Sequence, residues 1–289
     1  KERGYIFESS TRKGYRLIYA PNLLTPLEID SALHMETFGR HVVYLSSTTS
    51  TNEEAKKIAR EGAEEGTIVV AEEQTGGRGR LTRSFYCPFA KGIWFTLILR
   101  PNFFPMEASK CTLMAAVGVC RGIRRLGLQD AGIKWPNDIL YHGKKLVGIL
   151  TEMSASMEKI DYIIIGAGIN TGMKKSEFPE LFRESATSFL AEGIDVSRKD
   201  LLAAILAELE KEYEIAQTQG FDKVLEDWKA LSVTLGQDVR VIMGEENYTG
   251  KAVDIDKDGC LLVDTGEKVE RVIAGDVSIR PIDAPLPKR

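Results

Sequence analysis

Histidine and cysteine are scarce in this chain of 289 residues, which contains three His and four Cys. The four cysteines, Cys87, Cys111, Cys120 and Cys260, form no C-x-x-C pair. A structural zinc site needs about four closely spaced Cys or His ligands, so we expect no metal ligands from the protein. Scattered cysteines in a chain of this size are typical of a reducing compartment, which predicts a cytoplasmic protein.

Long apolar runs and a strong charge excess are missing as well. No run of about 18 apolar residues occurs, so no membrane-spanning helix is predicted. The 38 Lys and Arg against 42 Asp and Glu give a net charge of −4. This balance excludes a uniformly basic nucleic-acid-binding protein, and any contact with nucleic acid has to come from a local patch.

The order of predicted elements divides the chain into three parts. Residues 1–20 read as two short strands around a turn, with five Lys or Arg against two acids, and are too small to hold a core of their own. From about residue 29 to 231 helical and strand patterns alternate, including a helix at 51–66 with Thr51 or Asn52 as N-cap. Short strands with turn signals then predict a small β-barrel. We therefore predict an α+β protein with domains at 1–27, 28–232 and 233–285.

The strongest local signal is the run GGRGRLTR at 76–83, directly after a predicted strand. Its three glycines allow positive φ and close approach of a ligand to backbone N–H groups. Its arginines supply guanidinium forks for phosphate or carboxylate, so a nucleotide phosphate is the favoured ligand. The alternative is a solvated basic loop of the RGG kind. The run is neither a Walker A loop nor a Rossmann fingerprint.

Three further segments carry polar or small residues at strand ends. KWPND at 134–138 combines a proline-fixed turn with an amide and a carboxylate, although taken alone it is better explained as an Asx-turn. KKLVGIL at 144–150 begins with two lysines, which suit either a cleft or an exposed turn. GAGIN at 166–170 permits tight packing against a backbone, either by a ligand or by a crossing strand.

Taken together, these segments resemble one family. The order STTSTN, EEQTGGRGR, KWPNDI, KKLVGIL and GAGINTG is similar to that of the biotin–protein ligases, and the resemblance covers about residues 40–285. It implies a catalytic fold akin to class II aminoacyl-tRNA synthetases followed by an SH3-like β-barrel. It also implies an ATP-dependent ligase that forms biotinoyl-5′-AMP and transfers biotin to a lysine of a biotin carboxyl carrier protein.

The resemblance assigns roles to particular residues. Lys145 and Arg80 are implied as catalytic. Biotin would be bound by Ser50, Thr51, Asn52, Gln74, Arg78, Gly79, Arg80 and Lys145. ATP or the adenylate would be bound by Arg78, Arg80, Arg83, Phe85, Trp135, Asn137, Asp138, Gly166, Gly168 and Asn170, with Mg²⁺ accompanying ATP. The family commonly has Gly where Thr82 stands and Trp where Phe85 stands.

The same resemblance bears on partners and alternatives. In bifunctional members a winged helix-turn-helix precedes the catalytic domain, and the hairpin at 1–20 is similar to its wing without the recognition helix. We therefore expect a truncated form of a ligase and repressor, which binds DNA only weakly, and the family also suggests a homodimer. A lipoate–protein ligase and a corepressor-dependent DNA-binding regulator are the alternatives. The GGRGR run favours biotin over lipoate, and the missing helices argue against the regulator for this chain.

Overall fold

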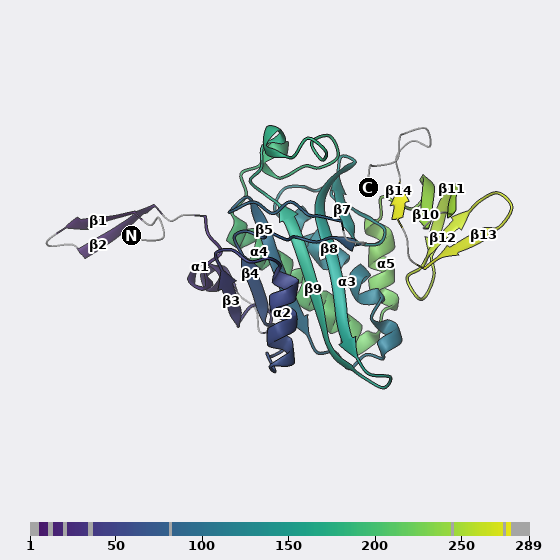
Figure 1. Cartoon of the computed structure of the whole chain (residues 1–289), viewed down its shortest axis with the longest axis horizontal. Helices are drawn as coiled ribbons and strands as arrows, with labels where there is room; N and C mark the ends of the chain where they lie inside the picture. The colour runs from purple at the N-terminus through teal and green to yellow at the C-terminus, as the bar shows by residue number, and fades with distance from the viewer. Residues whose placement is uncertain are drawn as a thin grey trace.

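The computed structural model describes residues 6–10, 14–19, 22–33, 37–80, 83–243, 246–273 and 276–278. Figure 1 shows a hairpin at one end, a large layered body, and a small sheet at the other end. The hairpin consists of β1 (Ile6–Ser10) and β2 (Gly14–Tyr19), paired antiparallel. The N-terminal and C-terminal sheets therefore lie on opposite sides of the body that carries the motifs.

A seven-stranded sheet forms the centre of the body. Its order is β3-β4-β5-β9-β8-β7-β6, with β3 and β4 parallel and all other neighbours antiparallel. The strands are β3 (Val42–Leu45), β4 (Ile68–Ala71), β5 (Gly92–Leu99), β6 (Gly132–Lys134), β7 (Asp138–Tyr141), β8 (Lys144–Ala155) and β9 (Ile160–Asn170). Strands far apart in sequence, such as β5 and β9, become neighbours at the centre of the sheet.

Side chains of β5 and β9 divide between the two faces of the sheet with the period of two expected for strands. On one face, Phe95, Leu97 and Ile165 join the main hydrophobic core. The other face carries Thr96 opposite Gly166 and Trp94 opposite Gly168. Small and polar residues on this second face leave room above the centre of the sheet.

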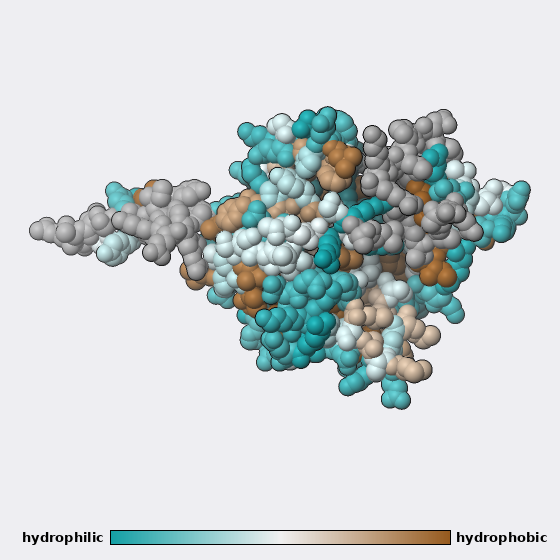
Figure 2. Space-filling view, viewed as in Figure 1, coloured by the Kyte–Doolittle hydropathy of each residue, from teal (hydrophilic) through white to brown (hydrophobic). Residues whose placement is uncertain are grey.

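Helices cover the two faces unequally, as Figure 1 shows. The face with the main core is covered by α3 (Lys110–Arg125), α4 (Arg198–Gln219) and α5 (Asp222–Leu231). The opposite face carries α2 (Thr51–Arg60), whose Ala55 and Ala59 pack against Ile98 and Ile164. Figure 2 shows that the outer surface over α2 is hydrophilic. A short helix, α1 (Pro26–Ala32), precedes β3 and is capped by Thr25.

A buried ion pair ties several of these elements together. The Arg198 guanidinium lies 2.8 Å from the Glu72 carboxylate, with both side chains 2% exposed or less. Arg198 also donates to the carbonyls of Gly92 and Asn22, while Glu72 accepts from the backbone N–H of Leu24. Burial lowers the pKa of Arg198, and the charge of Glu72 opposes that effect. The pair fixes the end of β4, two residues before Gln74, against the start of β5.

The C-terminal part is a five-stranded antiparallel sheet in the order β13-β12-β11-β10-β14. Its strands are β10 (Asp238–Met243), β11 (Glu246–Ile255), β12 (Leu261–Asp264), β13 (Val269–Val272) and β14 (Asp276–Ser278). Among the described residues, no helix has the length and apolar character needed to span a bilayer. The predicted domain boundaries stay predictions.

Candidate active site

The N-terminus of α2 contributes the first group of predicted site residues. Ser50, not Thr51 or Asn52, is the N-cap, and it is an extended residue at φ −161° whose side chain makes no capping bond. The predicted cap is therefore wrong, because both following residues already have helical geometry and turn their side chains inward. Thr51 and Asn52 are 3% and 6% exposed, which places them under α2 rather than in solvent.

Gln74 meets this helix start. Its Oε1 accepts the Thr51 backbone N–H at 2.7 Å and lies 3.0 Å from the Thr51 hydroxyl, while its Nε2 donates to Cys87 Sγ at 3.1 Å. Burial raises the pKa of the Cys87 thiol to about 12, despite the Gln74 hydrogen bond, so this sulfur is a neutral partner rather than a nucleophile. Gln74 is thus held in one orientation by groups on both sides.

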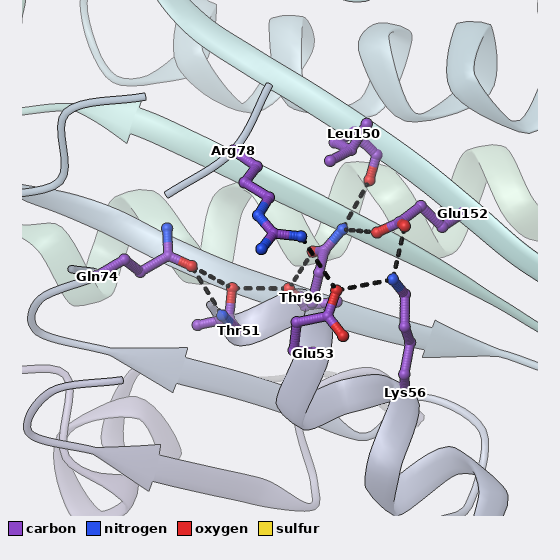
Figure 3. Close-up of polar contacts among 9 residues, drawn as sticks. Thr51, Glu53, Lys56, Gln74, Arg78, Thr96, Leu150 and Glu152 are labelled. Carbon is purple, nitrogen blue, oxygen red and sulfur yellow. Dashed lines mark hydrogen bonds and ion pairs between the residues drawn. The ribbon is translucent and has the colours of Figure 1, made fainter. Parts of the chain in front are cut away.

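Asn52 is the centre of a second polar chain, whose other members Thr96, Glu152 and Lys56 are labelled in Figure 3. Its Nδ2 donates to Glu152 Oε2 at 2.8 Å, and its Oδ1 accepts from the Thr96 hydroxyl at 2.7 Å. Lys56 bridges Glu152 at 2.6 Å and Glu53 at 2.9 Å. Burial alone would lower the pKa of Lys56, but the hydrogen bonds to Glu152 and Glu53 outweigh it and raise that pKa. Lys56 is therefore a charged ammonium between the two carboxylates.

Two glycines of β9 allow these side chains to lie on the sheet. A Cβ at Gly166 would stand 2.0 Å from Asn52 Oδ1, and a Cβ at Gly168 would stand 2.7 Å from the Phe85 ring. Residues two apart in a strand share a face and are separated by roughly 7 Å. Asn52 and Phe85 therefore lie side by side on the face of the sheet that the main core does not use, covering the two glycines predicted to contact the adenylate.

The glycine–arginine loop has a defined path at 76–80. Gly76 donates to the carbonyl of Thr49, and Gly77 accepts from the N–H of Phe85. None of its glycines has a positive φ, so the predicted conformational reason for them is wrong. Close approach explains Gly77, where a Cβ would stand 2.5 Å from the Phe85 carbonyl oxygen. Gly79 donates to the Arg83 carbonyl at 2.6 Å, and Thr82 lies outside the described residues.

Arg80 and Lys145 converge on two adjacent residues of the KWPND turn. Arg80 Nη1 donates to Asn137 Oδ1 at 3.3 Å, and Lys145 Nζ lies 2.7 Å from Asp138 Oδ1. The Lys145 ammonium is also 5.7 Å from the centre of the Phe85 ring. Backbone bonds from Lys145 to Ser185 and Thr187 fix its strand position. Two cations from distant segments thus face one small region of the sheet.

Other predicted residues lie outside this convergence. Trp135 is 3% exposed, and its indole donates to the carbonyl of Gly259 in the C-terminal part. The Asn170 amide donates to the Thr187 carbonyl at 3.0 Å. The Arg78 side chain is 69% exposed and lies 4.0 Å from Glu53, and Arg83 is exposed. The roles of these residues in binding biotin or the adenylate stay predictions.

Three residues of this polar chain, Thr96, Glu152 and Lys56, were not among the predicted site residues. A signal for Thr96 was available, because it interrupts an otherwise apolar strand on the face that carries Gly166 and Gly168. Glu152 contacts Asn52 across 100 residues of sequence and Lys56 across 96, so no local pattern predicts either contact. Among the residues that the structure describes, no group of three or more His, Cys, Asp or Glu could hold a metal ion.

The seven-stranded sheet with its glycine–arginine loop and the C-terminal sheet each match a known protein family. Residues 44–170 match the Biotin/lipoate A/B protein ligase family, and residues 234–280 match the Biotin protein ligase C terminal domain. The Bifunctional ligase/repressor BirA of Bacillus subtilis is 38% identical over 280 residues, which cover 96% of this chain and 86% of that protein. This chain therefore belongs to the biotin–protein ligase family.

Two further relatives support the assignment. The Biotin–[acetyl-CoA-carboxylase] ligase of Mycobacterium tuberculosis is 32% identical over 245 residues, which cover 82% of this chain and 88% of that protein. The structure of the biotin protein ligase from Aquifex aeolicus in complex with biotin and ATP superposes with a TM-score of 0.71 at 27% identity, covering 83% of this chain and 99% of that one. The predicted family, fold class and enzyme class are confirmed.

Proposed function

We propose that this chain activates biotin with ATP and transfers it to a lysine of a biotin carboxyl carrier protein. In the first step a biotin carboxylate oxygen attacks the α-phosphorus of ATP, and the bond to the departing pyrophosphate breaks. In the second step a carrier lysine amine attacks the acyl carbon, AMP leaves, and the amine loses a proton. The observation that carries the proposal is the convergence of Arg80 and Lys145 on Asn137 and Asp138.

The proposal gives the two cations one task. A carboxylate and a triphosphate repel each other, and negative charge grows on the phosphate oxygens as the first step proceeds. Fixed positive groups stabilise that charge without reorganisation. The Lys145 ammonium, aimed by Asp138 and backed by Phe85, suits the developing charge, while Arg80 suits the planar carboxylate or phosphate.

The remaining residues bind and orient the two substrates. Thr51, Asn52 and Gln74 would hold the biotin rings, and the 76–80 loop would close over the carboxyl end to exclude water. Mg²⁺ would neutralise the ATP phosphates. Because the described residues form no metal cluster, they fit an ion carried by phosphate oxygens and water rather than a protein cage.

A direct assay tests the proposal against the lipoate alternative. The protein, incubated with ATP and labelled pyrophosphate, is expected to show exchange that requires biotin and not lipoate. Added carrier domain is expected to become labelled on lysine with biotin, and excess lipoate is expected to leave that labelling unchanged. Lipoate-dependent exchange without biotin-dependent exchange would reject the proposed substrate.

We propose DNA binding only as a weak, sequence-independent property of this chain. The relative from B. subtilis is named a ligase and repressor, and the hairpin here exposes Tyr15 and Ile18 at 83% and 53%. A two-stranded hairpin offers few phosphate contacts, so its affinity for DNA should be low, and the decrease of that affinity with rising salt should be as small as the number of contacts. Gel shifts at moderate salt are expected to show no preference between a biotin operator and random DNA. A sequence-specific complex would contradict this.

A further inference from the structure

Glu152 determines which end of the Asn52 amide faces which neighbour. A carboxylate only accepts hydrogen bonds, so the Asn52 NH₂ group has to face Glu152 Oε2 at 2.8 Å, as the structure has it. The second amide N–H points to the carbonyl of Leu150 at 3.4 Å. Both donors of Asn52 are therefore directed at the protein, and its oxygen is left as the acceptor.

This polarity continues through two hydroxyls. The Thr96 hydroxyl lies 2.7 Å from Asn52 Oδ1 and 2.8 Å from Thr51 Oγ1, and it has one proton to give. Asn52 Oδ1 cannot donate, so Thr96 gives its proton to Asn52. Thr51 then directs its own proton to Thr96 or to Gln74 Oε1, both of which are protein atoms.

The pattern presented to a ligand follows from these assignments. Thr51 Oγ1 and Asn52 Oδ1 each keep acceptor lone pairs, and no proton of either side chain is available. Gln74 places one amide N–H on Cys87 and has a second N–H of its own to donate. A cyclic urea has two N–H donors and one carbonyl acceptor. The acceptors of Thr51 and Asn52, together with the amide donor of Gln74, are complementary to that pattern.

Lys56 holds the origin of this polarity in place. Its ammonium lies between Glu152 Oε1 and Glu53 Oε1, and Figure 3 shows the Lys56 side chain extending from α2 toward both carboxylates. Without that cation, the Glu152 and Glu53 carboxylates would repel each other, and the hydrogen bond from Asn52 alone would hold Glu152 near that amide. The Glu152 side chain is 34% exposed, so it has room to move away.

We propose that Glu152, held by Lys56, is a positioning residue that selects a ligand with ureido N–H donors by fixing the amide of Asn52. Glu152 does not touch the substrate; it acts through Asn52, Thr96 and Thr51. This inference rests on the proposed function, since it describes how the same site would recognise the biotin ring. A lipoate ring, which has no N–H, would leave the acceptors unpaired.

Glu152→Gln is the first test. A glutamine can face Asn52 with either end of its amide, so the polarity of the chain is no longer fixed. We expect the KM for biotin to rise about tenfold with the KM for ATP unchanged. The second measurement uses a biotin analogue with oxygen in place of one ureido N–H. We expect the ratio of kcat/KM for biotin to kcat/KM for this analogue to be about tenfold smaller in the variant than in the wild type.

An exchange of groups provides the sharper test. Asn52→Asp alone sets two carboxylates against each other and should raise the KM for biotin more than Glu152→Gln does. In the double variant Asn52→Asp with Glu152→Gln, the glutamine amide donates to the aspartate while Lys56 and Thr96 keep their acceptors. We expect this pair to return to within about threefold of the wild-type KM, which is a coupling that independent sites do not show.

The controls separate the possible failures. Glu226→Gln removes an exposed carboxylate paired with Lys223 on α5 and should leave biotin KM and ligand preference unchanged. Thermal unfolding checks that each variant folds, and Lys56→Gln provides a second route if Glu152→Gln does not fold, with a rise in KM of about threefold. Absence of biotin-dependent exchange in the wild type rejects the proposed function. An active wild type with unchanged KM and preference in these variants rejects only the role of Glu152.

Discussion

Lys145→Ala is expected to slow the formation of biotinoyl-5′-AMP by about 10²–10³-fold, the effect of removing one preorganised charge that stabilises a transition state. The Lys145 ammonium lies 2.7 Å from Asp138, so its removal also leaves that carboxylate without the cation, near the place proposed for the phosphates. Biotin affinity should change little, because the groups proposed to hold the rings lie on α2 and at Gln74. Single-turnover adenylation and calorimetric titration with biotin measure the two quantities separately.

The neighbouring lysine provides a matched control. Lys144 has the same charge one position earlier in β8, pairs with Tyr141 in the ladder, and makes no contact with Asp138 among those the structure shows for the described residues. Lys144→Ala is expected to keep the wild-type adenylation rate. If Lys145→Ala adenylated biotin at a rate close to that of Lys144→Ala, Lys145 could not be the electrostatic catalyst.

Arg80→Ala is expected to speed the escape of the bound adenylate by about tenfold or more, the scale of one hydrogen bond to a charged group. Arg80 fastens the 76–80 loop to the KWPND turn through Asn137 Oδ1 at 3.3 Å. Without this contact the loop should open more often, and the reactive anhydride should reach lysines of unrelated proteins. Release of labelled adenylate and labelling of a bystander protein are the measurements.

The control for Arg80 is an arginine far from the loop. Arg125 lies at the end of α3, 2.9 Å from Glu208, and its side chain is 60% exposed. Arg125→Ala should release adenylate at the wild-type rate and label only the carrier domain. Retention of the adenylate by Arg80→Ala would show that the loop does not act as a lid.

The sequence alone predicted the family, the alternation of helices and strands, and the separate C-terminal sheet. Local periodicity and turn residues carry that information, since each element depends on residues within one short segment. The motif order also selected Gln74, Arg80 and Lys145. Local reasoning failed at the start of α2, where the cap is Ser50, and at the loop glycines, where contact with Phe85 rather than positive φ explains Gly77.

Only the tertiary structure decided which side chains meet. Asn52 and Glu152 are 100 residues apart in the sequence, and Trp135 and Gly259 are 124 apart. Such pairs depend on strand order and on which face each strand presents, and a one-residue change of register would reverse every side chain. The sequence therefore determines which chemical groups are present. Their donor and acceptor directions depend on the packing of α2 against the face of β9 that carries Gly166 and Gly168.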